Sequence, residues 1–73
     1  MSQLSGENIL KNQRLKRTWT QEEAAKRMGI SRSYYVMVER GRRLPSVQVA
    51  RKIEMVFGID WHIWFENMKV KVG

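Results

Sequence analysis

The sequence predicts an all-α fold, a compact five-helix domain comprising residues 1–73. Apolar residues recur at helical spacing, Ser, Thr or Asp residues precede these segments, and glycines follow several of them. Apolar residues make up 42% of the 73 residues, which suffices for a core near the lower size limit of an independent domain. Because cysteine is absent, packing rather than disulfides or thiolate-bound zinc must stabilise this domain.

The first two helices are predicted over residues 7–18 and 20–28. The first of these ranges contains no helix-breaking residue. Thr20, with Glu23 three residues later, has the pattern of a capping box at the start of the second helix. Gly29 follows the last apolar position of that helix and is expected to end it.

Two more helices are predicted over residues 31–40 and 45–57, each bounded by the same kind of signal. Ser31 is expected to cap the third helix, which Gly41 ends. Pro and Ser open the fourth helix, and Gly58 closes it.

A short fifth helix is predicted over residues 61–68, with Asp60 as its cap. Three of its aromatic residues are spaced i, i+3 and i+4, which places them on one face. We expect Trp61 and Phe65 to close the core. Trp64 either joins them or helps to form a dimer contact.

The chain is strongly basic, which bears on the kind of partner it binds. Fourteen Lys and Arg residues against seven Asp and Glu residues give a formal charge of +7. This excess favours a polyanionic partner, with nucleic acid ahead of an acidic membrane surface. The N-terminal residues lack the pattern of a signal peptide, and no apolar run is long enough to span a membrane. We therefore expect a cytoplasmic protein.

The second and third predicted helices are separated by only three residues, Gly29 to Ser31. Two helices joined at a steep angle by a short turn that contains glycine describe a helix-turn-helix. The blocks TQEEAAKRMGIS, SRSYYVMVERGRRLPS, and FGID before WHIWF resemble the phage repressor and Cro-type (XRE) family of helix-turn-helix regulators. The resemblance covers about residues 9–66, with the motif at about 20–40, and implies a lambda-repressor-like DNA-binding domain.

A helical wheel divides the third predicted helix into two faces. Tyr35 and Val38 point into the core, and Tyr34 lies at its margin, where its hydroxyl can reach water or a phosphate. The opposite face mixes basic, small and apolar side chains: Arg32, Ser33, Val36, Met37 and Arg40. Arg and Ser can read base edges in the DNA major groove, while Val or Met can contact a thymine methyl group. The alternative is a solvated face with two scattered apolar residues, which is common.

The resemblance assigns roles to individual positions. It implies that the residues facing bases are Ser31, Arg32, Ser33 and Met37, with Val36 nearby. Together with Tyr34, the predicted contacts to the DNA backbone are Gln21, Arg40, Arg42, Arg43 and Ser46. Arg43 has a second possibility, the minor groove, and the arginine cluster has the plainer interpretation of solubilising charge.

Two further pairs of residues have more than one interpretation. Glu39 falls on the inward face, where an unpaired carboxylate would be costly, and the resemblance implies Arg14 as its partner in a structural salt bridge. His62 and Glu66 lie four apart and could present two metal ligands. Because no third ligand is evident, an ordinary surface pair is the simpler interpretation. We expect neither a metal nor another cofactor.

These observations predict a sequence-specific regulator that binds double-stranded DNA, a bacterial or phage-encoded repressor that binds a pseudo-palindromic operator as a homodimer. One alternative is an antitoxin of the same fold, which would also have a protein partner. Another is a protein-interaction module that sequesters a second regulator, and this module would show weak salt dependence. The sequence contains no carboxylate pair, no nucleophile with its base and no glycine-rich phosphate loop, so we do not expect an enzyme.

Overall fold

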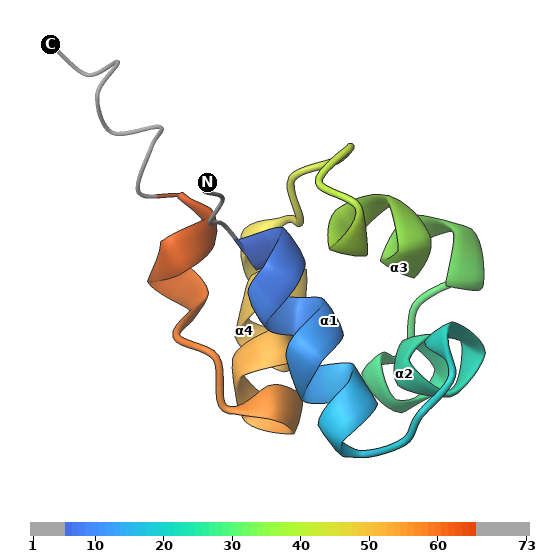
Figure 1. Ribbon diagram of the computed structural model, residues 1–73. Helices are drawn as coiled ribbons and strands as arrows, with labels where there is room; N and C mark the ends of the chain where they lie inside the picture. The colour runs from blue at the N-terminus through green and yellow to red at the C-terminus, as the bar shows by residue number, and fades with distance from the viewer. Residues whose placement is uncertain (1–5, 66–73) are drawn as a thin grey trace, which may run out of the picture.

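The computed structural model describes residues 6–65, which form four α-helices and one short 3₁₀ helix (Figure 1). The elements are α1 (Gly6–Lys16), α2 (Gln21–Met28), α3 (Arg32–Glu39), α4 (Val47–Phe57) and η1 (Trp61–Trp64). Residues 6–65 contain no β-strand, which confirms the all-α prediction for this part of the chain. None of these helices has the length and hydrophobicity needed to cross a bilayer.

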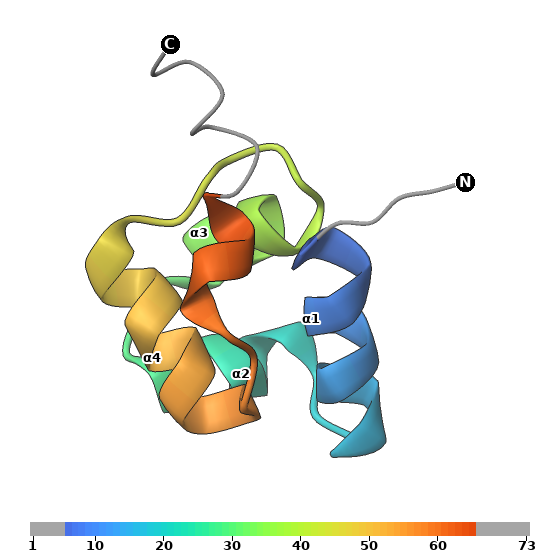
Figure 2. The ribbon, with the colours of Figure 1, turned by 90° about the vertical axis from the view of Figure 1, so that its left-hand side faces the viewer.

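The helices surround one core. α4 contacts α1, α2 and η1, and α3 packs against both α1 and α2. Turned by 90°, the molecule shows η1 between α1 and α4 (Figure 2). Every element contributes buried apolar side chains, which are Leu10, Ala24, Ala25, Met28, Tyr35, Val38, Ala50, Ile53, Phe57, Ile59 and Trp64.

The predicted fifth α-helix is wrong within the described part of the chain, where this element is the single 3₁₀ turn η1. Asp60 caps it as expected, because its carboxylate accepts the His62 N–H at 2.9 Å. Side chains three apart eclipse each other in a 3₁₀ helix, so Trp64 can turn inward together with Trp61. Trp64 joins the core at 8% exposure, and Trp61 meets Phe65 edge to face, with 5.9 Å between ring centres. The remaining predicted residues, 66–68, lie outside the described part.

The first helix ends two residues earlier than predicted. Thr18 adopts a left-handed backbone conformation with φ of 59°, which a helix cannot continue through. The Trp19 N–H then bonds back to the Arg14 carbonyl at 3.2 Å. This turn brings the Trp19 ring edge to face with Phe57, with 5.6 Å between ring centres.

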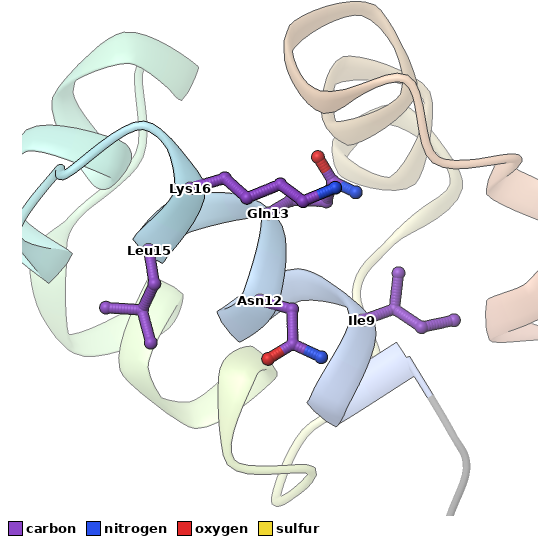
Figure 3. A pocket seen from close by; sticks show the side chains of 5 residues that line it. All are labelled: Ile9, Asn12, Gln13, Leu15 and Lys16. Carbon is purple, nitrogen blue, oxygen red and sulfur yellow. The ribbon is translucent and has the colours of Figure 1, made fainter.

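The outer side of α1 carries an open hollow, which is lined by Ile9, Asn12, Gln13, Leu15 and Lys16 (Figure 3). Ile9 is 40% exposed and Leu15 is 51% exposed, so the core face of α1 is narrower than its apolar content suggests. No residue of α3 lines this hollow.

Candidate nucleic-acid interface

The start of α2 is fixed by the capping box that the sequence predicted. The Thr20 hydroxyl accepts the Glu23 N–H at 3.0 Å, and the Glu23 carboxylate accepts the Thr20 N–H at 2.9 Å. Two N–H groups that the first turn would leave unpaired are therefore satisfied. The reciprocal bonds hold Gln21, the next residue, at the open end of the helix.

The turn between α2 and α3 is equally well defined. Gly29 adopts a left-handed conformation with φ of 69°, which favours glycine, and the Ile30 N–H bonds back to the Ala25 carbonyl at 3.0 Å. Ser31 then caps α3, because its hydroxyl accepts the Tyr34 N–H at 3.1 Å. Each joint of the turn has its own hydrogen bond, so α3 starts in a fixed direction.

α3 has one buried face and one exposed face, as the helical wheel predicted. Tyr35 and Val38 are buried, and Tyr34 is half-buried. The opposite face forms an open hollow with the start of α2, here called the α3 hollow, which is lined by Gln21, Arg32, Ser33, Val36, Met37 and Arg40. Ser31 is exposed at the start of the same helix. The fold thus brings most of the residues assigned to bases onto one concave surface, beside two of those assigned to the backbone.

The charge and polarity of the α3 hollow suit a DNA edge. Arg32 and Arg40 are its only charged lining residues, and both are exposed. Met37 is 41% exposed and Val36 is half-buried, so the α3 hollow combines apolar surface with two cationic side chains. A DNA major groove offers both acceptor atoms and thymine methyl groups, which this mixed surface can contact.

A buried ion pair lies behind the α3 hollow. Arg14 Nε donates to Glu39 Oε1 at 2.8 Å, and Arg14 Nη2 donates to Oε2 at 3.0 Å. A further Arg14 nitrogen, Nη1, donates to the Trp19 carbonyl at 2.9 Å. Both side chains are almost completely buried, so each charged group has lost most of its hydration. The hydrogen bonds between the carboxylate and the guanidinium compensate for this loss.

Glu39 also reaches the interface. Gln21 Nε2 donates to Glu39 Oε2 at 3.1 Å, so the side chain assigned to a phosphate is oriented by the buried pair. Burial by itself raises the pKa of Glu39, but the hydrogen bonds and positive charge of Arg14 and the hydrogen bond from Gln21 outweigh it and leave this pKa below its ordinary value. The pKa of Tyr35 is raised by burial and by the adjacent negative charge of Glu39. Because its pKa is below the ordinary value, the Glu39 carboxylate is ionised at neutral pH.

The segment after α3 carries the remaining arginines. Gly41 takes a left-handed conformation with φ of 74°, and the N–H groups of Arg42 and Arg43 both donate to the Met37 carbonyl, at 2.8 and 3.2 Å. This turn folds the backbone against the end of α3. The Arg42 and Arg43 side chains are exposed beside the α3 hollow rather than within it.

Tyr34 makes contacts that the sequence did not reveal. Its hydroxyl accepts the Ser46 N–H at 3.1 Å, and the Arg43 guanidinium lies over its ring, 5.1 Å from the ring centre. Tyr34 and the Ser46 amide were each assigned to phosphate. In the free protein they bond to each other, so a phosphate would share or replace this hydrogen bond. No local pattern signals the contact, because the two residues are twelve apart.

His62, one of the two possible metal ligands, pairs with Asp60. His62 Nδ1 lies 2.8 Å from the Asp60 carboxylate, and both side chains are largely exposed. The pKa of Asp60 is lowered by the hydrogen bond from the His62 backbone N–H. Glu66 lies outside the described residues. Within residues 6–65, no three His, Asp or Glu side chains gather as metal ligands.

A capped helix, a three-residue turn and a second helix with an exposed basic and apolar face together define a helix-turn-helix protein. Residues 10–64 match the family described as "Helix-turn-helix". The chain belongs to this family, as an XRE-type member, and the family consists of DNA-binding transcriptional regulators rather than enzymes.

Several known proteins are similar to this chain. It is 51% identical over 59 residues to the uncharacterized HTH-type transcriptional regulator YqaF of Bacillus subtilis. The aligned stretch covers 81% of this chain and 78% of that protein. An uncharacterized HTH-type transcriptional regulator of Methanocaldococcus jannaschii is 40% identical over 52 residues, covering 71% and 79%. The ImmF control region 10 kDa protein of Bacillus phage phi105 is 33% identical over 55 residues, covering 75% and 61%. No solved structure gave a significant match.

Proposed function

We propose that this protein is a transcriptional repressor that binds a pseudo-palindromic operator as a homodimer, with α3 in the major groove. The observation that carries the proposal is the α3 hollow, where Arg32, Ser33, Val36 and Met37 lie together on the exposed side of a helix that is rigidly placed by its caps. The relative from phage phi105 is a control-region protein by name, which supports a role in regulating genes.

Contacts within this proposal divide into two groups. Four residues that line the α3 hollow, together with Ser31 at the start of α3, face the bases: Arg32, Ser33, Val36 and Met37. The residues that face the DNA backbone are Gln21 and Arg40, which also line the hollow, and Tyr34, Arg42, Arg43 and Ser46 outside it. The free N–H groups at the starts of α2 and α4 add partial positive charge for phosphate. The protein acts where the DNA is, in the cytoplasm of a bacterial cell.

Selection from a random pool of double-stranded DNA tests the proposal. We expect the bound sequences to share two inverted half-sites whose centres are about 34 Å, or one helical turn, apart. Binding to the selected sequence should weaken steeply as salt rises, because several phosphates exchange their counterions for arginine. Recovery of no common sequence, together with a flat salt dependence, would favour the alternative of a protein-interaction module.

A further inference from the structure

A second hollow lies on a different part of the surface, where the last turn of α2 meets the C-terminal half of α4. These two helices pack against each other (Figure 2). The lining of this α2–α4 hollow is Lys26, Arg27, Met28, Gly29, Lys52, Met55 and Val56. It shares no residue with the α3 hollow. The residues of the α2–α4 hollow are therefore distinct from those assigned to DNA.

The apolar floor of the α2–α4 hollow extends beyond the core, from buried Met28 and half-buried Val56 to exposed Met55. Met55 is 84% exposed, although α4 already buries Ala50, Ile53 and Phe57. Val56 is half-buried beside it, so apolar surface continues from the core to the outside. A flexible methionine adapts to many apolar partners, and its exposure contributes nothing to the stability of the free protein.

The rim of the hollow is entirely cationic. Its charged residues are Lys26, Arg27 and Lys52, and no carboxylate lines it. Within residues 6–65 none of the three forms a salt bridge, since the ion pairs there join other residues. Arg27 is held in place with its guanidinium 4.4 Å from the centre of the Trp19 ring. The rim therefore presents three cations that no carboxylate of the described residues neutralises.

Helix polarity accounts for only part of this pattern. Basic residues in a last turn offset the negative end of a helix, and Lys26 and Arg27 occupy the last turn of α2. That effect requires no exposed apolar side chain. The combination of three cations with Met55 therefore points to an occupant that has both carboxylates and an apolar side chain.

The chemistry of the hollow separates the possible occupants. A DNA backbone would neutralise the rim but would leave Met55 uncovered, because phosphates offer no apolar surface. A second copy of this chain carries the same formal charge of +7, which opposes association at a cationic rim. An acidic amphipathic segment of another protein matches both the rim and the floor.

We propose that the α2–α4 hollow is a docking surface for an acidic amphipathic helix of a partner protein. The cations of the rim pair with carboxylates of the partner, and Met55 and Val56 cover one or two of its apolar side chains. This docking surface depends on the fold but not on DNA binding by α3. The docking proposal and the proposed DNA-binding function can therefore fail independently of each other.

A synthetic helical peptide of about 15 residues, with Leu at i and i+4 and Glu on the flanking positions, serves as the probe. Two-dimensional NMR of the full chain follows its titration. We expect saturable binding below about 1 mM, with shifts at residues 26–29 and 52–56 and none on the exposed face of α3. Peptides with Lys in place of Glu, or Ser in place of Leu, should not bind.

Matched variants locate the binding. Lys52→Glu and Met55→Ser should each weaken binding by about tenfold, through repulsion and through loss of apolar contact. Lys11→Glu alters the net charge by the same amount as Lys52→Glu, at an exposed position on α1. It should change the affinity for the peptide by less than about twofold. Thermal melts confirm that each variant folds, and Met55→Ser alters a side chain that the core does not use.

Several results would overturn the proposal. One is an absence of saturation, and another is an equal loss of binding in Lys52→Glu and Lys11→Glu, which would show that only net charge matters. Peptide shifts on the α3 hollow would mean that the peptide imitates DNA. Shifts at residues 26–29 and 52–56 on adding duplex DNA would identify nucleic acid as the occupant. Self-association that Met55→Ser abolishes would identify a second copy instead.

Discussion

Arg32 and Arg43 carry the same charge but occupy different places. Arg32 is the first residue of α3 and lines the α3 hollow, so it points where the helix would enter a groove. Arg43 lies beyond the turn at Gly41, and the Tyr34 ring holds it outside the hollow. In the proposed function, Arg32 therefore contacts a base, and Arg43 contacts a phosphate or the minor groove.

Alanine substitutions at these two arginines should have different effects. Arg32→Ala should relax the preference at one base position in each half-site, because a bidentate contact to guanine discriminates by about 1–3 kcal/mol. Arg43→Ala should weaken binding to all sequences and flatten the slope of log K against log salt by about one unit. Titrations on matched and single-substituted sites at several salt concentrations measure both effects. A uniform loss of affinity in Arg32→Ala would contradict its role as a base reader.

Tyr34 allows a second comparison between single residues. Tyr34→Phe removes the acceptor of the Ser46 N–H but keeps the ring under Arg43, so we expect a loss of about 0.5–1.5 kcal/mol in the free energy of unfolding. Both Tyr34→Phe and Tyr34→Leu lose the hydroxyl that is assigned to the DNA backbone, and Tyr34→Leu removes the ring as well, so it should weaken DNA binding further by releasing Arg43. Urea denaturation and DNA titration measure the two effects. Unchanged stability in Tyr34→Phe would show that the hydrogen bond contributes nothing.

Between elements, the pair formed by Arg14 and Glu39 ties three helices together. Arg14 comes from α1 and Glu39 from α3, and Gln21 of α2 donates to the same carboxylate. A chain of 73 residues has about 4–11 kcal/mol of stability at usual per-residue values. One buried pair can therefore decide whether the domain folds.

Breaking this pair from either side should destabilise the fold. We expect Glu39→Gln or Arg14→Met to lower the free energy of unfolding by about 3–5 kcal/mol, because each leaves a buried partner uncompensated. The exposed residues Glu54 and Lys16 supply matched controls, Glu54→Gln and Lys16→Met, which should change it by less than about 0.5 kcal/mol. Urea denaturation compares all four. Single variants as stable as the wild type would exclude a stabilising bridge.

The same pair predicts a dependence on pH. Because the pKa of Glu39 is below its ordinary value of 4.5 in the folded protein, its contribution is complete above that value. It is lost as the pH falls from there through the lower pKa of the folded state. The stability gap between the wild type and Glu39→Gln should therefore narrow on acidification, as measured by urea denaturation at a series of pH values. A gap that is constant down to about pH 2 would contradict this linkage.

Much of the arrangement of the helices could be predicted from the sequence, because their ends are marked locally. Thr20, Ser31 and Ser46 each cap a helix through a hydrogen bond within three residues, and Gly29 and Gly58 end helices in a left-handed conformation. The 3.6-residue period likewise placed the two faces of α3 correctly. Such signals act over one or two turns, which is the range that a sequence pattern can report.

Features that depend on distant contacts could not be predicted. The geometry of η1 depends on how its aromatic rings fit against the core, so periodicity alone suggested a longer α-helix. The early end of α1 depends on Trp19 reaching Phe57, thirty-eight positions along the chain by their numbers. The bond between Tyr34 and Ser46 likewise requires the folded turn after α3.

For the molecule as a whole, charge and size lead to the same expectation about assembly. The formal charge of +7 favours DNA but opposes the association of free chains. DNA neutralises part of this charge, so two copies can approach on an operator more easily than in solution. Next to α4, Trp61, Ile63 and Phe65 are only half-buried and supply apolar surface for such a contact.

Sedimentation of the protein with DNA tests the homodimer. On a duplex that carries the full palindrome, we expect two chains per site, bound cooperatively because the half-sites lie about 34 Å apart on the same face of the helix. A duplex of equal length with one half-site scrambled is the control, and it should bind a single chain more weakly. The free protein should sediment as a monomer at low concentration, since no DNA is present to neutralise the positive charge of its copies. One chain bound at saturation on the full palindrome would contradict the homodimer, and two chains bound without cooperativity would instead indicate an independent monomer on each half-site.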